Sequence, residues 1–425
     1  MKASGISPNV ATALVVANMI GTGVFTTSGL LLEKLGSPGL VLLAWLGGGI
    51  TALLGALCYG ALARQFPESG GEYAYLSHTL PGPAAFVTGW ITLIVGFAVP
   101  LAALAFAFAE YLRPWLPVGL PPRVVGTAIL VLTSLLHWFS ISAGAKVQAV
   151  VVAIEVILIT LLASFGLRRV FADGVPSQIV VSHPGQMGVA LILVSYSYVG
   201  WNGAAYIASE VRDASKTLPR VFLMGTLVVT ALYLALNAFF VYAAPVADLA
   251  GRIDVGHIAA EHVGGPGLTM IVSGIVALAV AMCVSALTMT GPQLAGRMAA
   301  DGLLPKAFRS RPGQPPRLAI VGQLVLGLLA LWTATFDAIL TYVGVSLGLC
   351  TGATVWGLIR LRRRQGSAVP VPGWPWVPAL FLLFMLGATA WTILLRPREG
   401  LVGIGTVVLF AVLYWVRRAS AVDVS

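Results

Sequence analysis

The sequence predicts an all-α integral membrane protein with twelve transmembrane helices, and composition and segmentation are the two observations behind this prediction. Of the 425 residues, 58% are hydrophobic and only 9% are charged, whereas about 25% are charged in a typical soluble domain. The mean hydropathy is +0.93. Since a helix needs about 20 apolar residues to cross the bilayer, the chain has room for about a dozen spans, and we expect the lipid bilayer to be its solvent.

Apolar segments separated by charged, proline-rich or glycine-rich stretches mark the individual spans. A first block of five helices is expected within residues 1–168, a second within 185–360, and two further helices within 374–418. The twelve predicted spans are residues 8–33, 38–64, 82–113, 121–142, 144–168, 185–209, 218–244, 266–298, 316–335, 337–360, 374–395 and 399–418.

The basic residues predict the orientation of the chain. The formal net charge is +10, but Lys and Arg lie in short loops rather than in one patch, so no nucleic-acid partner is expected. With the N-terminus inside, 17 of the 25 basic residues fall in inner segments, and the eight outside are Lys34, Arg113, Arg123, Arg168, Arg169, Arg252, Arg396 and Arg398. The positive-inside rule then predicts a multi-pass protein of the cell membrane with both termini in the cytoplasm.

The three cysteines, Cys58, Cys283 and Cys350, all lie in apolar segments. A dispersed, odd set without CxxC spacing indicates neither a disulfide framework nor a metal site. We therefore expect small core residues and no cofactor, with proton or sodium coupling left open. No outer-loop cysteine is evident for linkage to a second chain, so no obligatory accessory subunit is expected.

Two predicted spans are interrupted in corresponding ways. Gly21-Thr22-Gly23 breaks the first span and residues 199–203 break the sixth, and each of these spans opens a block of five helices. The third and eighth spans are both unusually long, at about 32 residues or roughly 48 Å. Matching irregularities in the two blocks indicate an inverted five-helix repeat.

A break at mid-membrane leaves amides and carbonyls without partners, and such breaks survive only beside a cavity or a ligand. The amides of Gly21, Thr22 and Gly23 begin the second half-helix, and its positive dipole end suits a carboxylate. The carbonyls near Ile20, and those of Ser197 and Val199, suit an ammonium group. Together they describe an α-amino acid headgroup. A single GxG would rather indicate close helix packing, but two matching breaks favour the binding site.

Three motifs resemble those of the amino acid–polyamine–organocation (APC) superfamily of transporters. They are Ile-Gly-Thr-Gly-Val-Phe at residues 20–25, Phe-Pro-Glu-Ser-Gly-Gly-Glu-Tyr-Ala-Tyr at 66–75, and the stretch from Tyr196 through Gly-Trp-Asn at 200–202 to Leu-Pro-Arg at 218–220. The resemblance implies a LeuT-like 5+5 inverted repeat, alternating access, and a substrate held between the broken first and sixth helices.

The Gly-Trp-Asn sequence is similar to that of the L-type amino acid branch of this superfamily. This similarity implies that Tyr196 stands at the position of the branch's aromatic gate and that Asn202 lies near the substrate side chain. Trp201 is equally well explained as a packing residue. No acidic residue is expected beside either break, which favours neutral amino acids over arginine or polyamines.

Glu155 occupies the position in the fifth span where many proton-coupled or exchanging relatives have a lysine. A carboxylate within a span is a functional candidate by default. It would exchange a proton, or hold a cation with the hydroxyls of Ser285 and Thr288, or else remain protonated against a backbone carbonyl with no role in coupling. His137 is expected to be a hydrogen-bonded packing residue. Two glutamates in the loop after the second span, Glu68 and Glu72, are expected in gate ion pairs or in solvent.

Other classes of function fit the sequence less well. A membrane-embedded enzyme needs a cluster of catalytic or metal-binding side chains within the spans, and a channel needs a selectivity element; neither is present. A sensor that binds amino acids without transporting them would carry the same binding motif, and a cationic amino acid or polyamine antiporter would carry the same fold. The predicted function is secondary transport of amino acids, by symport or exchange.

Overall fold

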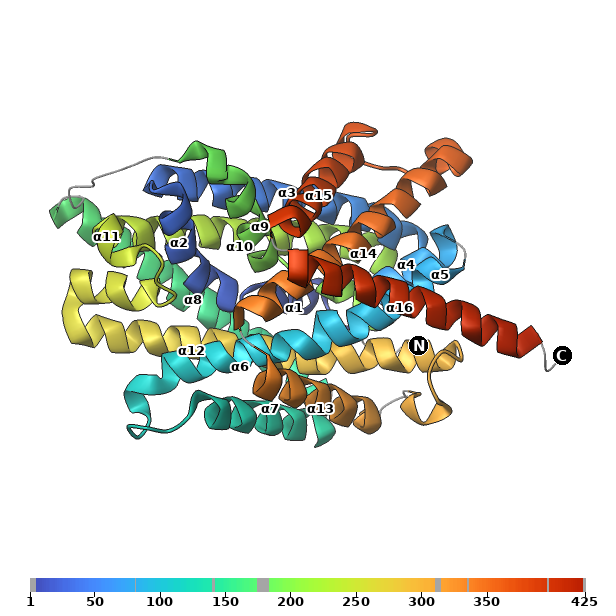
Figure 1. Ribbon diagram of the computed structural model, residues 1–425, viewed down its shortest axis with the longest axis horizontal. Coiled ribbons are helices and arrows are strands. Elements are labelled where there is room, and N and C mark those ends of the chain that lie inside the picture. Colours follow the sequence, from blue (N-terminus) through green and yellow to red (C-terminus); the bar gives the residue numbers. More distant parts are fainter. Residues whose placement is uncertain are drawn as a thin grey trace.

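The computed structural model describes residues 5–80, 82–139, 142–173, 183–309, 315–334, 336–395 and 397–422. Within these ranges every regular element is a helix, and the only β-type pairing is an isolated bridge between Ile6 and Val211 (Figure 1). Three of the basic residues used to predict the orientation, Lys2, Arg311 and Arg396, lie outside the described residues.

The first predicted span consists of two helices, α1 (Pro8–Met19) and α2 (Thr22–Leu35), which are bent by 40° at the predicted break. Ser7 caps α1 through its side chain and Pro8 occupies the first helical position, where the missing N–H costs nothing. The α1 helix ends because Ile20 and Gly21 are extended. The α2 helix ends at Gly36, whose φ of 65° makes a left-handed C-cap.

The first block continues through four further predicted spans. The third predicted span of the chain is a single run in which a π-helical turn, η1, separates α5 from α6. Such π turns inside α-helices occur frequently at functional sites. The elements are α3 (Pro38–Gln65), α4 (Gly71–Thr79), α5 (Pro83–Ile91), η1 (Thr92–Ala98), α6 (Val99–Leu112), α7 (Pro122–Phe139) and α8 (Ser142–Asp173).

The second block begins with the other break. The sixth predicted span is an 11-residue α-helix followed by an 8-residue 3₁₀ helix, so neither piece alone is long enough to cross a bilayer. A kink at Gly265, with φ of 63°, divides the long α12, and its apolar part begins at Pro266. The elements are α9 (Met187–Ser197), η4 (Gly203–Glu210), α10 (Ala214–Ala243), α12 (Val255–Ala300), α13 (Arg317–Thr333) and α14 (Phe336–Gln365).

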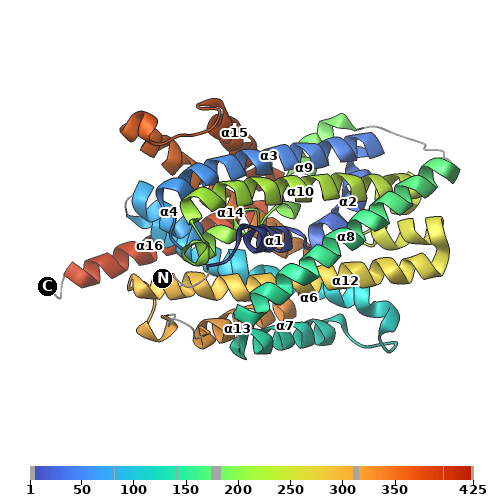
Figure 2. The same ribbon diagram turned by 180° about the vertical axis from the view of Figure 1, so that it is seen from behind.

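Two peripheral helices, α15 (Trp376–Leu395) and α16 (Pro397–Val422), follow the second block. The remaining short elements are η2 (Arg113–Trp115), η3 (Pro184–Gln186), α11 (Val246–Leu249), η5 (Lys306–Phe308) and η6 (Gly366–Ala368). Figure 2 shows α1 in the middle of the molecule, where it packs against α8, α10 and α12.

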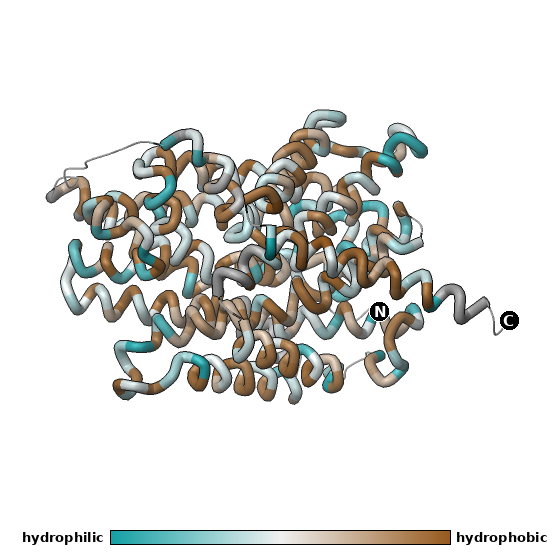
Figure 3. The backbone as a smooth tube through the Cα atoms, in the orientation of Figure 1, coloured by the Kyte–Doolittle hydropathy of each residue, from teal (hydrophilic) through white to brown (hydrophobic). Residues whose placement is uncertain are grey.

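The described residues include nine helices long and apolar enough to cross a membrane, or ten when the bent pair α1 and α2 is counted as one span. The α13 helix is apolar but has only 17 residues. Large apolar side chains are exposed on the outer helices, such as Leu136 at 68% on α7 and Leu161 at 60% on α8, and apolar residues run along the helices seen in Figure 3. Since soluble proteins do not expose such a continuous apolar area, the chain is a multi-pass membrane protein.

Candidate substrate site

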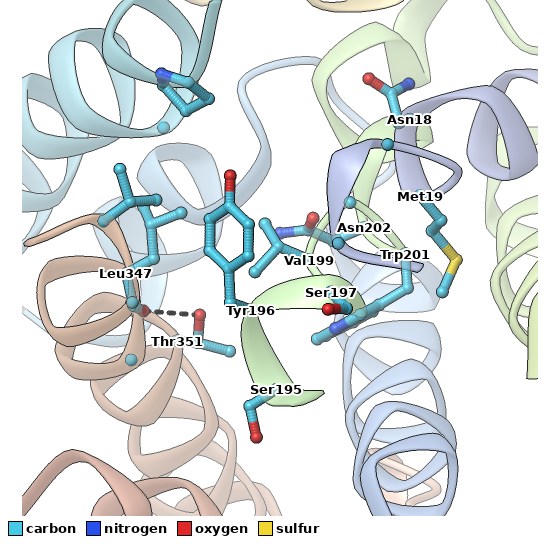
Figure 4. A pocket seen from close by; sticks show the side chains of 18 of the residues that line it. Asn18, Met19, Ser195, Tyr196, Ser197, Val199, Trp201, Asn202, Leu347 and Thr351 are labelled. Atoms are coloured by element: carbon cyan, nitrogen blue, oxygen red, sulfur yellow. Dashed lines mark hydrogen bonds between the residues drawn. The ribbon is translucent and has the colours of Figure 1, made fainter. Parts of the chain in front are cut away.

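A cavity of about 170 Å³ lies between the two breaks (Figure 4). Since one water needs about 10–15 Å³ of such volume, it has room for roughly ten waters or a small organic molecule. Seven of the eight residues predicted to bind substrate line it, and the lining does not include Ile20, which is buried beside the break. The seven are Gly21, Thr22, Gly23, Tyr196, Ser197, Val199 and Asn202.

The start of α2 forms one wall of the cavity. Its N-cap, Gly21, has no side chain to bond the first amides of this 14-residue helix, and these amides lie at the positive end of the helix dipole, which suits a negatively charged ligand. A Cβ on Gly23 would lie 2.7 Å from the Cα of Ser197. Glycine is therefore required at position 23 for the two broken helices to approach each other.

Tyr233 on α10 joins the two broken ends from behind. Its hydroxyl lies 2.5 Å from the Met19 carbonyl oxygen and 3.1 Å from the Ser197 carbonyl oxygen, and its side chain is buried. One hydroxyl proton serves either carbonyl at a time, and each carbonyl has two lone pairs. The carbonyl of Ser197, predicted from the sequence to face an ammonium group, is thus also held by a tyrosine that the sequence reasoning did not identify.

The aromatic residues at the sixth-span break have different surroundings. In Figure 4 the Tyr196 ring projects between Leu347 on α14 and Val199 at the break. Trp201 lines the cavity but also meets the ring of Tyr59 edge-on, with ring centroids 4.5 Å apart. Trp201 therefore has a packing partner, as the sequence reasoning allowed.

Glu72 is a cavity residue that the sequence reasoning placed in a loop. It is 2% exposed and lines the cavity. The expectation that no acidic residue lies beside either break is therefore wrong, because the Nδ2 of Asn202 donates to the Oε1 of Glu72 at 3.1 Å. The available signal was the pair of glycines before Glu72, which fold α4 against η4.

Three hydroxyl groups complete the surroundings of Glu72. Its Oε1 accepts from Tyr59 Oη at 2.5 Å and from Thr351 Oγ1 at 3.1 Å, and its Oε2 faces Thr92 Oγ1 at 3.4 Å. Burial raises the pKa of Glu72, and the hydrogen bonds from Tyr59, Thr351 and Thr92 act in the opposite direction. Among the described residues, Glu72 forms no ion pair.

Comparison with known sequences identifies the family. Residues 6–416 match the family described as amino acid permease. The chain belongs to this family. Its resemblance to APC transporters of the L-type branch is confirmed, and as a permease it is not an enzyme.

Three relatives of this permease are amino acid transporters by name. It is 28% identical to the Asc-type amino acid transporter 1 of Homo sapiens, over 95% of this chain and 81% of the relative. It is 29% identical to the large neutral amino acids transporter small subunit 2 of Mus musculus, over 90% and 75%. It is 26% identical to the b(0,+)-type amino acid transporter 1 of Homo sapiens, over 93% and 82%.

The predicted coupling residues of the permease lie behind the cavity rather than on its wall. Glu155 on α8 is 0% exposed, and neither carboxylate oxygen has a hydrogen-bond partner among the described residues. It lies within electrostatic range of Tyr233 and Cys283.

The two hydroxyls predicted to assist Glu155 bond to other groups. The Oγ of Ser285 lies 2.9 Å from the Nε2 of His137, and Thr288 donates to the Val284 carbonyl at 2.8 Å. His137 is buried and hydrogen-bonded, in keeping with the predicted packing role. Among the described residues, no group of three His, Cys, Asp or Glu side chains could hold a metal ion.

A network of ion pairs lies at the end of the permease near α4. Glu68 lies 2.5 Å from His78 and 3.0 Å from Arg297, which also pairs with Asp301 at 3.0 Å. Tyr73 donates to Asp301 at 2.8 Å. We call Glu68, Arg297 and Asp301 the latch, because these residues join the loop after α3 to the end of α12.

Proposed function

We propose that this permease is a secondary active transporter that moves neutral L-amino acids across the cell membrane by alternating access. The observation that carries the proposal is that both breaks face one cavity. The first amides of α2, which no N-cap side chain bonds, supply a carboxylate site, and the carbonyl ends of α1 and α9 supply an ammonium site. These two sites hold both charged groups of a zwitterion without a charged side chain.

The packing of the helices supports a LeuT-like inverted repeat of twelve spans. If the two blocks are equivalent, each helix of the first block has a counterpart at the same place in the second. Two helices that are in contact should then have counterparts that are also in contact. The contact of α1 with α8 corresponds to that of α9 with α14, and the contact of α6 with α7 to that of α12 with α13. The contact of α8 with α12 likewise corresponds to that of α14 with α6. An arrangement of this kind allows one block to rock against the other around a fixed site.

A chain of contacts supports the placement of both termini on one side. The Ile6 amide donates to the Glu210 carbonyl at 2.8 Å, and Ser69 and Ser209 bond reciprocally at 3.0 Å. The neighbouring latch leads to the loop after α12, where Arg417 of α16 donates to the Leu303 carbonyl at 3.1 Å. With the positive-inside rule, this side is the cytoplasm.

For the coupling, we propose Glu155 as a group that exchanges a proton during the cycle, and the α12 hydroxyls of Ser285 and Thr288 as the groups that would assist it if they exchanged their present partners. What supports this role is complete burial without a partner for either oxygen, since a carboxylate in such a place is stable only when protonated or when a cation joins it.

The substrate class and the assembly state complete the proposal. The presence of Glu72 in the cavity wall favours a cationic amino acid or polyamine instead. Its oxygens already face four neutral donors, however, so a neutral substrate fits better.

One relative is named a small subunit, which makes assembly with a second chain the alternative to a protein that works alone. All three cysteines of this sequence are buried, leaving no exposed thiol for a disulfide to such a chain, and we propose transport without an obligatory accessory subunit.

The test is uptake of a panel of radiolabelled amino acids into proteoliposomes, with and without an imposed pH gradient, by the native protein and by Glu155→Gln. Uptake of neutral amino acids that the gradient drives in the native protein but not in the variant supports both parts of the proposal. Exchange that does not depend on the gradient and persists in the variant would show that Glu155 has no role in coupling. If no amino acid is taken up, the protein is better explained as a sensor.

A further inference from the structure

Glu72 reaches the substrate cavity because of the Gly70-Gly71 pair. Gly70 has φ of 124° and Gly71 has φ of 58°, a left-handed conformation that residues with a side chain rarely adopt. A Cβ on Gly71 would also lie 2.6 Å from the ring carbon Cζ of Tyr206. The two glycines therefore let the first turn of α4 press against η4, which places Glu72 beside the sixth-span break.

The donors to Glu72 come from four separate parts of the fold. Tyr59 is on α3, Thr92 begins the π turn η1, Asn202 is in the break between α9 and η4, and Thr351 is on α14. Three of these four, and Glu72 itself, line the cavity. Any rearrangement of the broken sixth span therefore changes the number of donors that face this carboxyl group.

The geometry accommodates both protonation states of Glu72. Thr351 has one hydroxyl proton but two acceptors in reach, the Leu347 carbonyl at 2.8 Å and Glu72 Oε1 at 3.1 Å. If Thr351 donates to Leu347, its oxygen is free to accept a hydrogen bond from protonated Glu72. If Glu72 is ionised, the hydroxyls and the N-terminus of α4 favour the negative charge.

No described cation competes with the proton at this position. The titratable groups that interact electrostatically with Glu72 from the surrounding elements are Tyr59 on α3, Tyr75 on α4, Tyr206 on η4 and Cys350 on α14. All four are neutral near pH 7. The charge of this cluster is therefore set by whether Glu72 holds a proton.

We propose that Glu72 is a proton-binding site in the wall of the substrate cavity, and that Asn202 links its proton affinity to the position of the broken sixth span. Withdrawal of the Asn202 amide removes a donor that favours the ionised form, so the carboxyl group takes up a proton in that state and releases it when the amide returns. A charged hydrogen bond of this kind corresponds to a change in proton affinity of about tenfold or more. The proposal rests on the proposed transport function.

The first experiment measures the pH profile of amino acid exchange at equal pH on both sides of the vesicle membrane. The native protein should change its rate across the titration of Glu72. Glu72→Gln should lose this part of the pH dependence and keep only the part that Glu155 contributes, and Glu72→Asp should keep it with a shifted midpoint. Glu110→Gln removes an exposed carboxylate outside the cavity and should follow the native profile. An unchanged pH profile in Glu72→Gln overturns the proposal, even if its rate is lower at every pH.

A second experiment does not require transport. Infrared difference spectra of the native protein between acidic and neutral pH should contain the carboxylic acid C=O band of Glu72. This band should be shifted in frequency in Glu72→Asp and absent in Glu72→Gln. If no such band is lost from the variants, Glu72 does not titrate and the proposal fails. If the native protein transports no amino acid but this band is present, the transport function fails and the proton site stands.

Discussion

Glu72 and Glu155 are both buried carboxyl groups near the broken helices, but their surroundings are opposite. Glu72 faces four hydrogen-bond donors from four elements, whereas both oxygens of Glu155 lack any partner among the described residues. A carboxyl group that receives donors on both oxygens can hold either charge state, and one without donors strongly favours the neutral state. The comparison shows that burial alone does not decide the role of an acid; the donors around it do.

The largest expected effect is the contrast between two matched substitutions by leucine. Glu72→Leu leaves buried donors such as Tyr59 and Asn202 unsatisfied, and should lower the free energy of unfolding by about 3 kcal/mol or more. Glu155→Leu removes an unpartnered polar group from an apolar site and should be neutral or stabilise by about 1–3 kcal/mol. Thermal unfolding in detergent measures both. Equal destabilisation by the two would show that Glu155 has a partner in the native state.

The hydroxyl behind the cavity gives the next effect. Tyr233→Phe removes the hydrogen bond shared by Met19 and Ser197 and should cost about 1–3 kcal/mol, together with most of the exchange activity. Tyr198→Phe is the matched control, since among the described residues its hydroxyl donates to one carbonyl, that of Trp45 at 3.1 Å. It should lose stability but keep its rate of exchange. Similar exchange rates in the two variants would show that the Tyr233 hydroxyl is not needed for the function of the site.

The pH dependence of stability sharpens the comparison for Glu72. Burial raises its pKa in the folded protein above the ordinary value of 4.5, so the folded state binds the proton more tightly than the unfolded chain. The contribution of Glu72 to stability is then greatest below the ordinary carboxyl range and is lost as pH rises through the raised pKa. The difference in melting temperature between Glu72→Gln and the native protein should therefore shift in favour of Glu72→Gln as pH rises. A constant difference would contradict this.

The smallest expected effect concerns the latch. Its ion pairs are about one-third exposed, so Arg297→Gln should cost no more than about 1 kcal/mol, but it should open the latch side of the protein more often. A membrane-impermeant thiol reagent added from that side should then label Ser195→Cys, a cavity position, faster than without the Arg297 change. The matched control is Arg252→Gln, which breaks the exposed pair with Asp254 and should leave the labelling rate unchanged.

Local sequence signals predicted the breaks because glycines interrupt two corresponding apolar spans, and a glycine acts on the backbone of its own neighbourhood. Gly21, Gly23 and Asn202 reach the cavity for that reason, and the spans are visible from apolar length alone. Ile20 was placed in the site because free carbonyls were expected near the end of the first half-helix, and the cavity lining includes its neighbours Met19 and Gly21 instead.

The sequence reasoning missed residues whose roles depend on distant contacts. Glu72 lies 130 positions from Asn202 in the sequence, and it was placed in a loop because it follows an apolar span. Tyr233 similarly contacts the two breaks from the middle of α10, where its neighbours are apolar. The left-handed glycines at 70 and 71 were the one local sign that the backbone there makes a close approach.

The central claim is that the cavity between the two breaks carries the amino acid, and substitution at Gly23 tests it most directly. A methyl group there would meet Ser197 and force α2 and α9 apart, whereas Gly387→Ala on α15 adds a methyl group into open space. Uptake of radiolabelled neutral amino acids into proteoliposomes should be lost in Gly23→Ala and remain native in Gly387→Ala, with both variants folded by size-exclusion and thermal unfolding. Native uptake by Gly23→Ala would contradict the placement of the substrate in this cavity.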